Sequence, residues 1–335
     1  MLLTAFWAIL IFCLLIFVHE FGHFITAKAV GIRVNEFAIG MGPVIFKKKK
    51  GDTEYSLRIF PIGGYVKMEG EEDHSDDPSS FNNKPTWAKA LVVIAGSIMN
   101  LITTIVILSM LFFFLGFPTS TIKDVSAGNP AMTAGILSGD KIVKINEENI
   151  KTWDDVVSGI SNSKGDSINI TVNRNNENIL IETKVSKDDS GRRIIGITPA
   201  TEKNPLHALY LGLTGTFEMA KMMLVYLGQL LTGHGSSKDL MGPVGIVSTI
   251  GDFARKGFVY LANLTALISL NLAIVNMLPF PALDGGRLTF MLVRKFTGKV
   301  ITDEIENKIH FAGLMLLFSL MIWITIQDVG RFISK

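Results

Sequence analysis

The sequence is poor in cysteine and carries little excess of charge. Cys13 is the one cysteine in 335 residues, which excludes a disulfide framework and a zinc site built from cysteines. Acidic and basic residues nearly balance at a formal net charge of +2, so nothing indicates nucleic-acid binding. Six histidines are the remaining soft metal ligands. One of them, His74, lies in an acidic stretch where we expect a solvated loop.

The N-terminus lacks basic residues, since no Lys or Arg precedes the first apolar run. A secretory signal peptide needs such residues, so we expect residues 1–31 to be a retained helix. Residues 1–18 contain one polar residue, Thr4. As a helix they would span about 27 Å, close to the thickness of the hydrocarbon core of a bilayer.

Apolar residues are what the sequence has in excess. Hydrophobic residues make up 48% of the chain, and the mean hydropathy is +0.38, both typical of membrane proteins. We predict a polytopic α-helical membrane protein with about four transmembrane helices, in residues 1–31, 86–118, 258–287 and 310–335. Pro118 is expected to end the second helix.

The segments between these helices differ in character. Residues 119–200 alternate with period two in stretches such as DKIVKIN and SINITVN, which predicts a soluble domain of about 80 residues. Residues 201–257 begin with leucines at helical spacing, interrupted by Glu218 and Lys221. We expect an amphipathic helix on the membrane surface there, followed by a linker. Residues 288–309 should form a loop.

Residues 32–85 contain two strand-like stretches. EFAIGMGPVIF and EYSLRIFPIGGYVKM flank the turn-like KKKKGDT, which predicts a membrane-associated β-hairpin followed by an acidic loop. An exposed edge from Gly64 through Tyr65 and Val66 to Met68 would pair with an extended substrate segment. A hairpin with a purely structural role is the alternative.

Basic residues orient the predicted helices. They gather between the first two apolar runs, as in Lys28, Arg33 and Lys47–Lys50, and again between the last two. Short loops rich in Lys and Arg remain cytoplasmic, so we expect both loops inside and residues 119–200 outside. An even number of crossings in residues 201–257 preserves this arrangement, which favours a helix that does not span.

The string VHEFGHF, residues 18–24, places ionisable side chains in an apolar helix. His19 and His23 are four residues apart, so both imidazoles can reach one zinc ion, and Glu20 can act as the general base. Ionisable residues at bilayer depth cost about 2.5–3.5 kcal/mol each on insertion scales, and they are tolerated where they pair or bind a metal. We therefore predict one catalytic zinc ion.

A catalytic zinc site needs a third protein ligand. Asp284 follows the third apolar run in PFPALDGGR, on the predicted cytoplasmic side. Prolines preclude a regular helix before it, and Gly285 and Gly286 permit a sharp turn. His310, at the start of the last apolar run, is an alternative ligand, and a helix-capping role is the structural alternative for Asp284.

These motifs together resemble the site-2 protease family of intramembrane zinc metalloproteases, in particular its bacterial regulator-of-sigma-E branch. The resemblance covers almost the whole chain and implies zinc ligation by His19, His23 and Asp284, with Glu20 as the catalytic base. GSIMN, ending at Asn100, matches a family G-x-x-x-N pattern. Substrate handling is implied for Asn100, Asn271, Asn276, Pro279 and Pro281. Interhelical hydrogen bonding accounts for Asn271 and Asn276 equally well.

Residues 119–200 resemble a PDZ domain through NPAMTAGILSGDKIVKINEENI. The best-known members of the branch have two such domains, and this chain has room for one. The family implies cleavage of single-pass membrane proteins, such as trimmed anti-sigma factors or remnant signal peptides. It also implies a bacterial cytoplasmic (inner) membrane location with the site near the cytoplasm. The PDZ-like domain would bind a peptide or C-terminal tail, or act as a size filter. A membrane zinc transporter or sensor, or a PDZ-bearing scaffold, would be alternatives.

Overall fold

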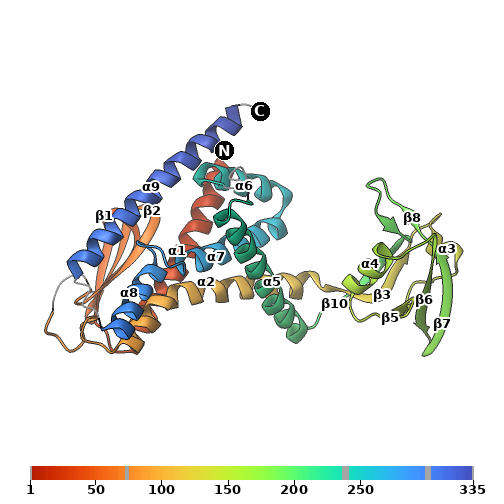
Figure 1. Ribbon diagram of the computed structural model, residues 1–335, viewed down its shortest axis with the longest axis horizontal. Helices are drawn as coiled ribbons and strands as arrows, with labels where there is room; N and C mark the ends of the chain where they lie inside the picture. Colours follow the sequence, from red (N-terminus) through yellow and green to blue (C-terminus); the bar gives the residue numbers. More distant parts are fainter. Residues whose placement is uncertain (1, 72–74, 236–240, 299–302, 334–335) are drawn as a thin grey trace. The chain divides into compact units, whose positions relative to one another are not determined.

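In the computed structural model the chain forms two units, Met1–Leu108 with Gly212–Lys335 and Ser109–Leu211 (Figure 1). The structure describes residues 2–71, 75–235, 241–298 and 303–333. His74, which we predicted to lie in a solvated loop, is outside these residues.

Four of the described helices are long and apolar enough to cross a membrane. They are α1 (Leu2–Ala29), α2 (Thr86–Leu115), α7 (Phe258–Asn276) and α9 (Asp303–Ile333). Large apolar side chains such as Phe6 and Phe311 are exposed along them. Lipid tails accept such a surface, whereas water disfavours it. The helices therefore agree with the predicted membrane-protein class.

The second of these helices ends earlier than the sequence predicts. Gly116 has a φ of 78°, the left-handed conformation in which glycine closes a helix without steric strain. Its N–H donates to the carbonyl oxygen of Phe112 at 3.0 Å. Pro118 lies inside strand β3 (Phe117–Val125), so the expectation that this proline ends the helix was wrong.

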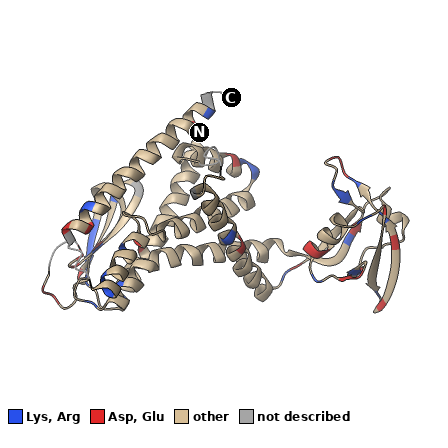
Figure 2. Ribbon diagram, viewed as in Figure 1, with Lys and Arg blue, Asp and Glu red and all other residues tan. Residues whose placement is uncertain are grey.

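The predicted hairpin consists of β1 (Val34–Lys50) and β2 (Thr53–Met68). The lysines belong to β1, and the turn is only Gly51 and Asp52. Each strand bends back on itself, so the two strands form four adjacent segments. Their order across the sheet is residues 44–50, 53–58, 34–39 and 64–68. Among the described strands, 64–68 therefore form an edge. Figure 2 shows charged residues gathered around this hairpin and the nearby helices, with mostly uncharged long helices beside them.

Helices α6 (Pro243–Lys256) and α8 (Asp284–Thr297) occupy segments that the sequence analysis assigned mainly to linker and loop. Ile250 of α6 is fully buried in a cluster with Ala8 and Leu15 of α1 and Leu261 of α7. This burial stabilises a 14-residue helix that would be marginal in isolation. Helix α5 (Pro205–Leu231) matches the predicted leucine-rich helix and is not among the four described helices apolar enough to span.

The second unit is an antiparallel sheet domain with its own core. Its main sheet has the order β10-β3-β4-β6-β7, with β5 paired to β4, and β8 and β9 form a separate pair. Its elements other than β3 are α3 (Pro130–Thr133), β4 (Lys141–Ile145), β5 (Glu148–Asn149), α4 (Trp153–Ser161), β6 (Ser167–Arg174), β7 (Glu177–Lys184), β8 (Ser186–Lys187), β9 (Arg193–Ile194) and β10 (Ile197–Glu202).

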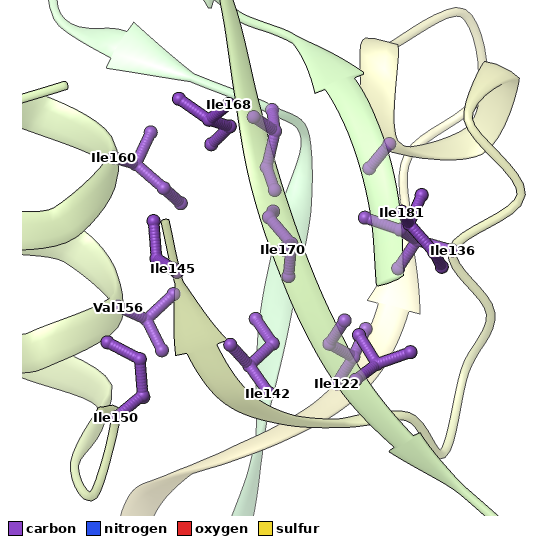
Figure 3. Close-up of a cluster of buried hydrophobic side chains, with 13 residues drawn as sticks. Ile122, Ile136, Ile142, Ile145, Ile150, Val156, Ile160, Ile168, Ile170 and Ile181 are labelled. Atoms are coloured by element: carbon purple, nitrogen blue, oxygen red, sulfur yellow. The ribbon is translucent and has the colours of Figure 1, made fainter. Parts of the chain in front are cut away.

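Isoleucines dominate this core. Ile168, Ile170 and Val172 are buried at alternate positions of β6, the period of two that the sequence predicts for a strand with one face covered. Val156 and Ile160 of α4 point toward this face (Figure 3). The helix therefore covers the sheet and closes the core.

Replacing Ile170 with Ala should destabilise the sheet domain. Ile170 is 0% exposed, so the cavity left behind should lower the free energy of unfolding by about 2–5 kcal/mol. Leu180, on the paired strand β7, is 67% exposed, and Leu180→Ala should change it by less than about 0.5 kcal/mol. Protease resistance of the domain in rising urea, in the full-length protein in detergent, measures both. Equal losses would contradict this core.

Candidate metal centre

Three side chains from the two ends of the first unit converge on one point. Helix α1 supplies His19 and His23, and Asp284 opens α8. Asp284 Oδ2 lies 3.2 Å from Nε2 of His19 and 3.4 Å from Nε2 of His23. The two Nε2 atoms are 3.3 Å apart. The structure thus brings together the three residues proposed as ligands from separate sequence arguments.

This spacing fits one zinc ion. Ligand atoms at about 2.0–2.1 Å from a tetrahedral ion are separated by roughly 3.3–3.4 Å from one another. Asp284 Oδ2 is buried and has no hydrogen-bond partner among the described residues, which leaves an oxygen that a cation would satisfy. Two imidazole nitrogens and one carboxylate oxygen are a ligand set of catalytic zinc sites, with the fourth position open.

Helix α2 orients the two imidazoles from behind. His23 Nδ1 lies 2.8 Å from the carbonyl oxygen of Val92, so Nδ1 carries the proton and donates, and the Nε2 lone pair is left for a metal. His19 Nδ1 lies 3.2 Å from the amide of Asn100, which is 0% exposed. A half-turn of this amide would let Oδ1, which has no other partner among the described residues, accept the Nδ1 proton.

Helix α2 can approach this closely because Gly96 has no side chain. A Cβ at Gly96 would lie 2.4 Å from His23 Nε2 and 2.8 Å from His19 Nε2, distances that real contacts do not reach. The G-x-x-x-N pattern is visible in the sequence, but no role was predicted for its glycine. The four-residue spacing was the available signal, because it puts Gly96 and Asn100 on one helix face.

The segment before Asp284 differs from the predicted turn. Gly285 and Gly286 are helical, and the residue with positive φ is Ala282, at 76°. A Cβ at Gly285 would lie 2.3 Å from the carbonyl oxygen of Leu278, and one at Gly286 would lie 2.2 Å from that of Phe280. The two glycines therefore permit close backbone packing rather than a sharp turn, and this packing sets the position of Asp284.

Two cavities meet at this centre. The larger, of about 770 Å³, is polar and includes Glu20, Lys67, Glu69 and Arg287 in its lining. The smaller, of about 270 Å³, is bounded by Ile16, Leu272 and other residues of α1, α7 and β2. His19, Glu20 and Asp284 border both, so the centre lies between a polar compartment and a more apolar one.

The structure separates the residues suggested for substrate handling. Asn276 Nδ2 lies 3.3 Å from His19 Nε2, and a Cβ at Gly64 would lie 3.2 Å from Glu20 Cγ. Tyr65 and Val66 line the larger cavity. Asn271 and Pro279 are exposed and line neither cavity, and Pro281 packs against Gly313 of α9.

Two side chains near Asp284, those of His310 and Arg287, make contacts of their own. His310, the alternative zinc ligand, is not part of the converging set, because its Nδ1 accepts a hydrogen bond from the Ala282 N–H at 2.8 Å. Arg287, one turn after Asp284 on α8, forms an ion pair with Glu71. This pair was not predicted from the sequence, because its partners are far apart in the chain.

A family model described as peptidase family M50 matches residues 7–320. The chain belongs to peptidase family M50. A Clostridium acetobutylicum protein named as a zinc metalloprotease by inference is 40% identical, with 96% of each chain covered. The regulator of sigma-W protease RasP of Bacillus subtilis is 32% identical over 96% of this chain and 97% of its own.

A solved PDZ domain of an SdrC-like protein from Listeria innocua is 29% identical to part of this M50 peptidase. The match covers 26% of this chain and 96% of the Listeria domain, with a TM-score of 0.23. Family and curated relatives confirm the prediction of an intramembrane zinc metalloprotease. The transporter and scaffold alternatives are not favoured.

Replacing Gly96 with Ala should disrupt the metal centre of the peptidase, because the added carbon would collide with both imidazoles. We expect zinc affinity to fall on the order of tenfold or more, the range seen when the support of a ligand is lost. Gly228→Ala in α5, where a Cβ meets nothing within 4 Å, is the matched control. Zinc titration of both purified variants is the measurement, and unchanged affinity in Gly96→Ala would contradict this packing.

Proposed function

We propose that this M50 peptidase cleaves single-pass membrane proteins within or near their transmembrane segments, at a centre close to the cytoplasmic face of a bacterial inner membrane. The observation that carries the proposal is the position of His19, Glu20 and Asp284 between a polar and a more apolar cavity. Hydrolysis inside a membrane needs both compartments, since water must meet a substrate that arrives from lipid.

The roles of the residues follow from their chemistry. His19, His23 and Asp284 hold the zinc ion, which supplies Lewis-acid activation of water and of the peptide carbonyl when bound. Glu20, adjacent to His19 on α1, accepts the proton of the attacking water and returns it to the leaving amine. The larger cavity, lined by Lys67, Glu69 and Arg287 beside Glu20, is the water reservoir in this proposal.

The proposed sidedness rests on basic residues around the hairpin. Lys28 lies in the last turn of α1, and Arg33 and Lys47–Lys50 follow later, before α2. Such residues favour the cytoplasmic side. The single crossing by α2 then leads to an extracytoplasmic sheet domain. We propose that this domain is PDZ-like and acts on substrates before cleavage, either by binding a peptide tail or by excluding intact ectodomains.

The substrate class is a membrane-anchored segment already trimmed on its outer side. The Bacillus subtilis relative is named as a regulator of sigma-W, which supports an anti-sigma factor as one substrate. Remnant signal peptides share the same features, a single apolar helix with a short outer end, and are the second candidate.

The free edge of β2 is proposed to hold the substrate in extended form. A helical substrate hides its carbonyl groups, and pairing with an edge strand exposes them in a defined register. Residues 64–68 offer such an edge, with Gly64 against Glu20 and Tyr65 to Met68 along the larger cavity.

Side chains behind this edge keep it ordered. The Tyr65 hydroxyl donates to Glu36 Oε2 at 2.6 Å, and Arg58 donates to the other oxygen of that carboxylate at 2.7 Å. Burial and the bond to Glu36 raise the pKa of Tyr65 to about 12, so the hydroxyl stays protonated and remains a donor well above neutral pH. An edge fixed in this way requires little ordering when a substrate pairs with it.

Glu20→Gln should retain zinc and lose cleavage. Glutamine keeps the shape of the side chain but cannot accept the proton of water, and a general base contributes about 10²–10⁴ in rate. Cleavage of a single-pass reporter by purified protein should fall by about that factor, with zinc content measured in the same preparation. A variant that cleaves at the wild-type rate would remove Glu20 from this role.

Prolines in the edge strand test substrate pairing. Successive backbone N–H groups of a strand point to opposite sides, so one of Val66 and Lys67 donates outward and the other points toward β1. Val66→Pro and Lys67→Pro should therefore differ. The outward position should lose on the order of tenfold in cleavage, while zinc content and protease resistance of the hairpin stay at wild-type values. Wild-type turnover in both variants would disprove substrate pairing at this edge.

A further inference from the structure

We infer that His310 is a positioning residue for Asp284, holding through one hydrogen bond the left-handed turn that leads to this carboxylate. The inference rests on the proposed function only in taking Asp284 as a zinc ligand. It gives a role to the histidine that the sequence analysis considered as a ligand and that the metal centre does not use.

The turn needs an external support. Ala282 has a φ of 76°, two residues before Asp284, in a region that alanine disfavours because its Cβ approaches the following carbonyl oxygen. The other described non-glycine residues with positive φ are all asparagines, at 146, 175 and 176. Asparagine stabilises this conformation with its own side chain, and alanine has no such means. Strained residues of this kind persist only where their surroundings hold them.

His310 supplies that support from α9. Its Nδ1 accepts the Ala282 N–H at 2.8 Å, so the ring proton resides on Nε2, which faces Glu306 Oε1 at 3.6 Å. The side chain is 16% exposed, and its ring centre lies 5.5 Å from that of Phe290 on α8. Contacts with the turn, with α8 and within α9 therefore restrict the imidazole to one orientation.

A second contact presses α9 against the same turn. Gly313 lies three residues beyond His310, and a Cβ there would be 2.6 Å from the carbonyl oxygen of Pro281. Helix α9 thus meets the turn at two consecutive residues, Pro281 and Ala282. Few of the described residues of α9 are buried, so these contacts join the turn before Asp284 to a helix that is otherwise mostly exposed.

Three substitutions at His310 separate the hydrogen bond from the bulk of the ring. Asparagine places Oδ1 where Nδ1 of histidine lies, two bonds from Cβ, and can accept the Ala282 N–H. Glutamine places its amide where Nε2 lies and cannot reach in the same way, and leucine accepts nothing. Full-length His310→Asn, His310→Gln and His310→Leu are compared after loading with cobalt(II), whose visible spectrum reports ligand geometry.

We expect His310→Gln and His310→Leu to shift the cobalt bands, to weaken cobalt binding about 10- to 100-fold, and to lower kcat with KM unchanged. His310→Asn should restore both the spectrum and the affinity. A wild-type spectrum and affinity in the glutamine and leucine variants would overturn the inference. So would a shift in all three variants alike, since that would mean a need for the ring rather than for the bond.

Glycine variants in the same helix provide an independent test that leaves His310 in place. Gly313→Ala should displace the turn and shift the cobalt bands, whereas Gly330→Ala, where a Cβ meets nothing within 4 Å, should not. Unshifted bands in Gly313→Ala would overturn the inference. A wild-type protein that binds cobalt but cleaves no membrane reporter would contradict the proposed substrate, and these spectra would still decide the role of His310. A wild-type protein that binds no cobalt would overturn both.

Discussion

The approach of two imidazoles and a carboxylate to 3.2–3.4 Å is the constraint on which the first unit depends. Such a cluster is unfavourable among apolar helices unless a metal and further hydrogen bonds satisfy it. Helix α2 meets part of that need with the Val92 carbonyl and the Asn100 amide. The packing of α1, α2 and α8 therefore follows from polar groups, although most of the surface that these helices bury is apolar.

The close packing of these helices is possible because glycines, which have no side chain, lie at the points of contact. Gly96 lets α2 reach the imidazoles, Gly285 and Gly286 let α8 fold onto the segment before it, and Gly313 lets α9 touch Pro281. Helices in a membrane gain little from burying apolar surface against each other, so close backbone approach through small residues is a main source of their cohesion. The same glycines that hold the helices together thus bring the metal ligands within reach of one ion.

Sequence patterns anticipated the elements whose signals are local. The apolar length of α1, the His-Glu-x-x-His spacing and the alternation in β6 each depend on nearby residues, and all appear in the structure. Helix α8 was missed because Asp284, Gly285 and Gly286 are poor helix formers, and contacts with residues 277–281 override that preference. The roles of Gly96 and His310 were hidden for a different reason, since each depends on a partner distant in the chain.

The two cavities make the two sides of the centre different, one polar and one more apolar. Glu20 borders both cavities, and Gly64 at the β2 edge lies beside it. If the hairpin edge holds the substrate as proposed, a peptide bond entering from the apolar side would reach Glu20 only after its backbone had paired along Gly64, which borders the smaller cavity. Water in the polar cavity has no such barrier to Glu20. Under the proposed function, access of substrate rather than of water would then be the step that the fold controls.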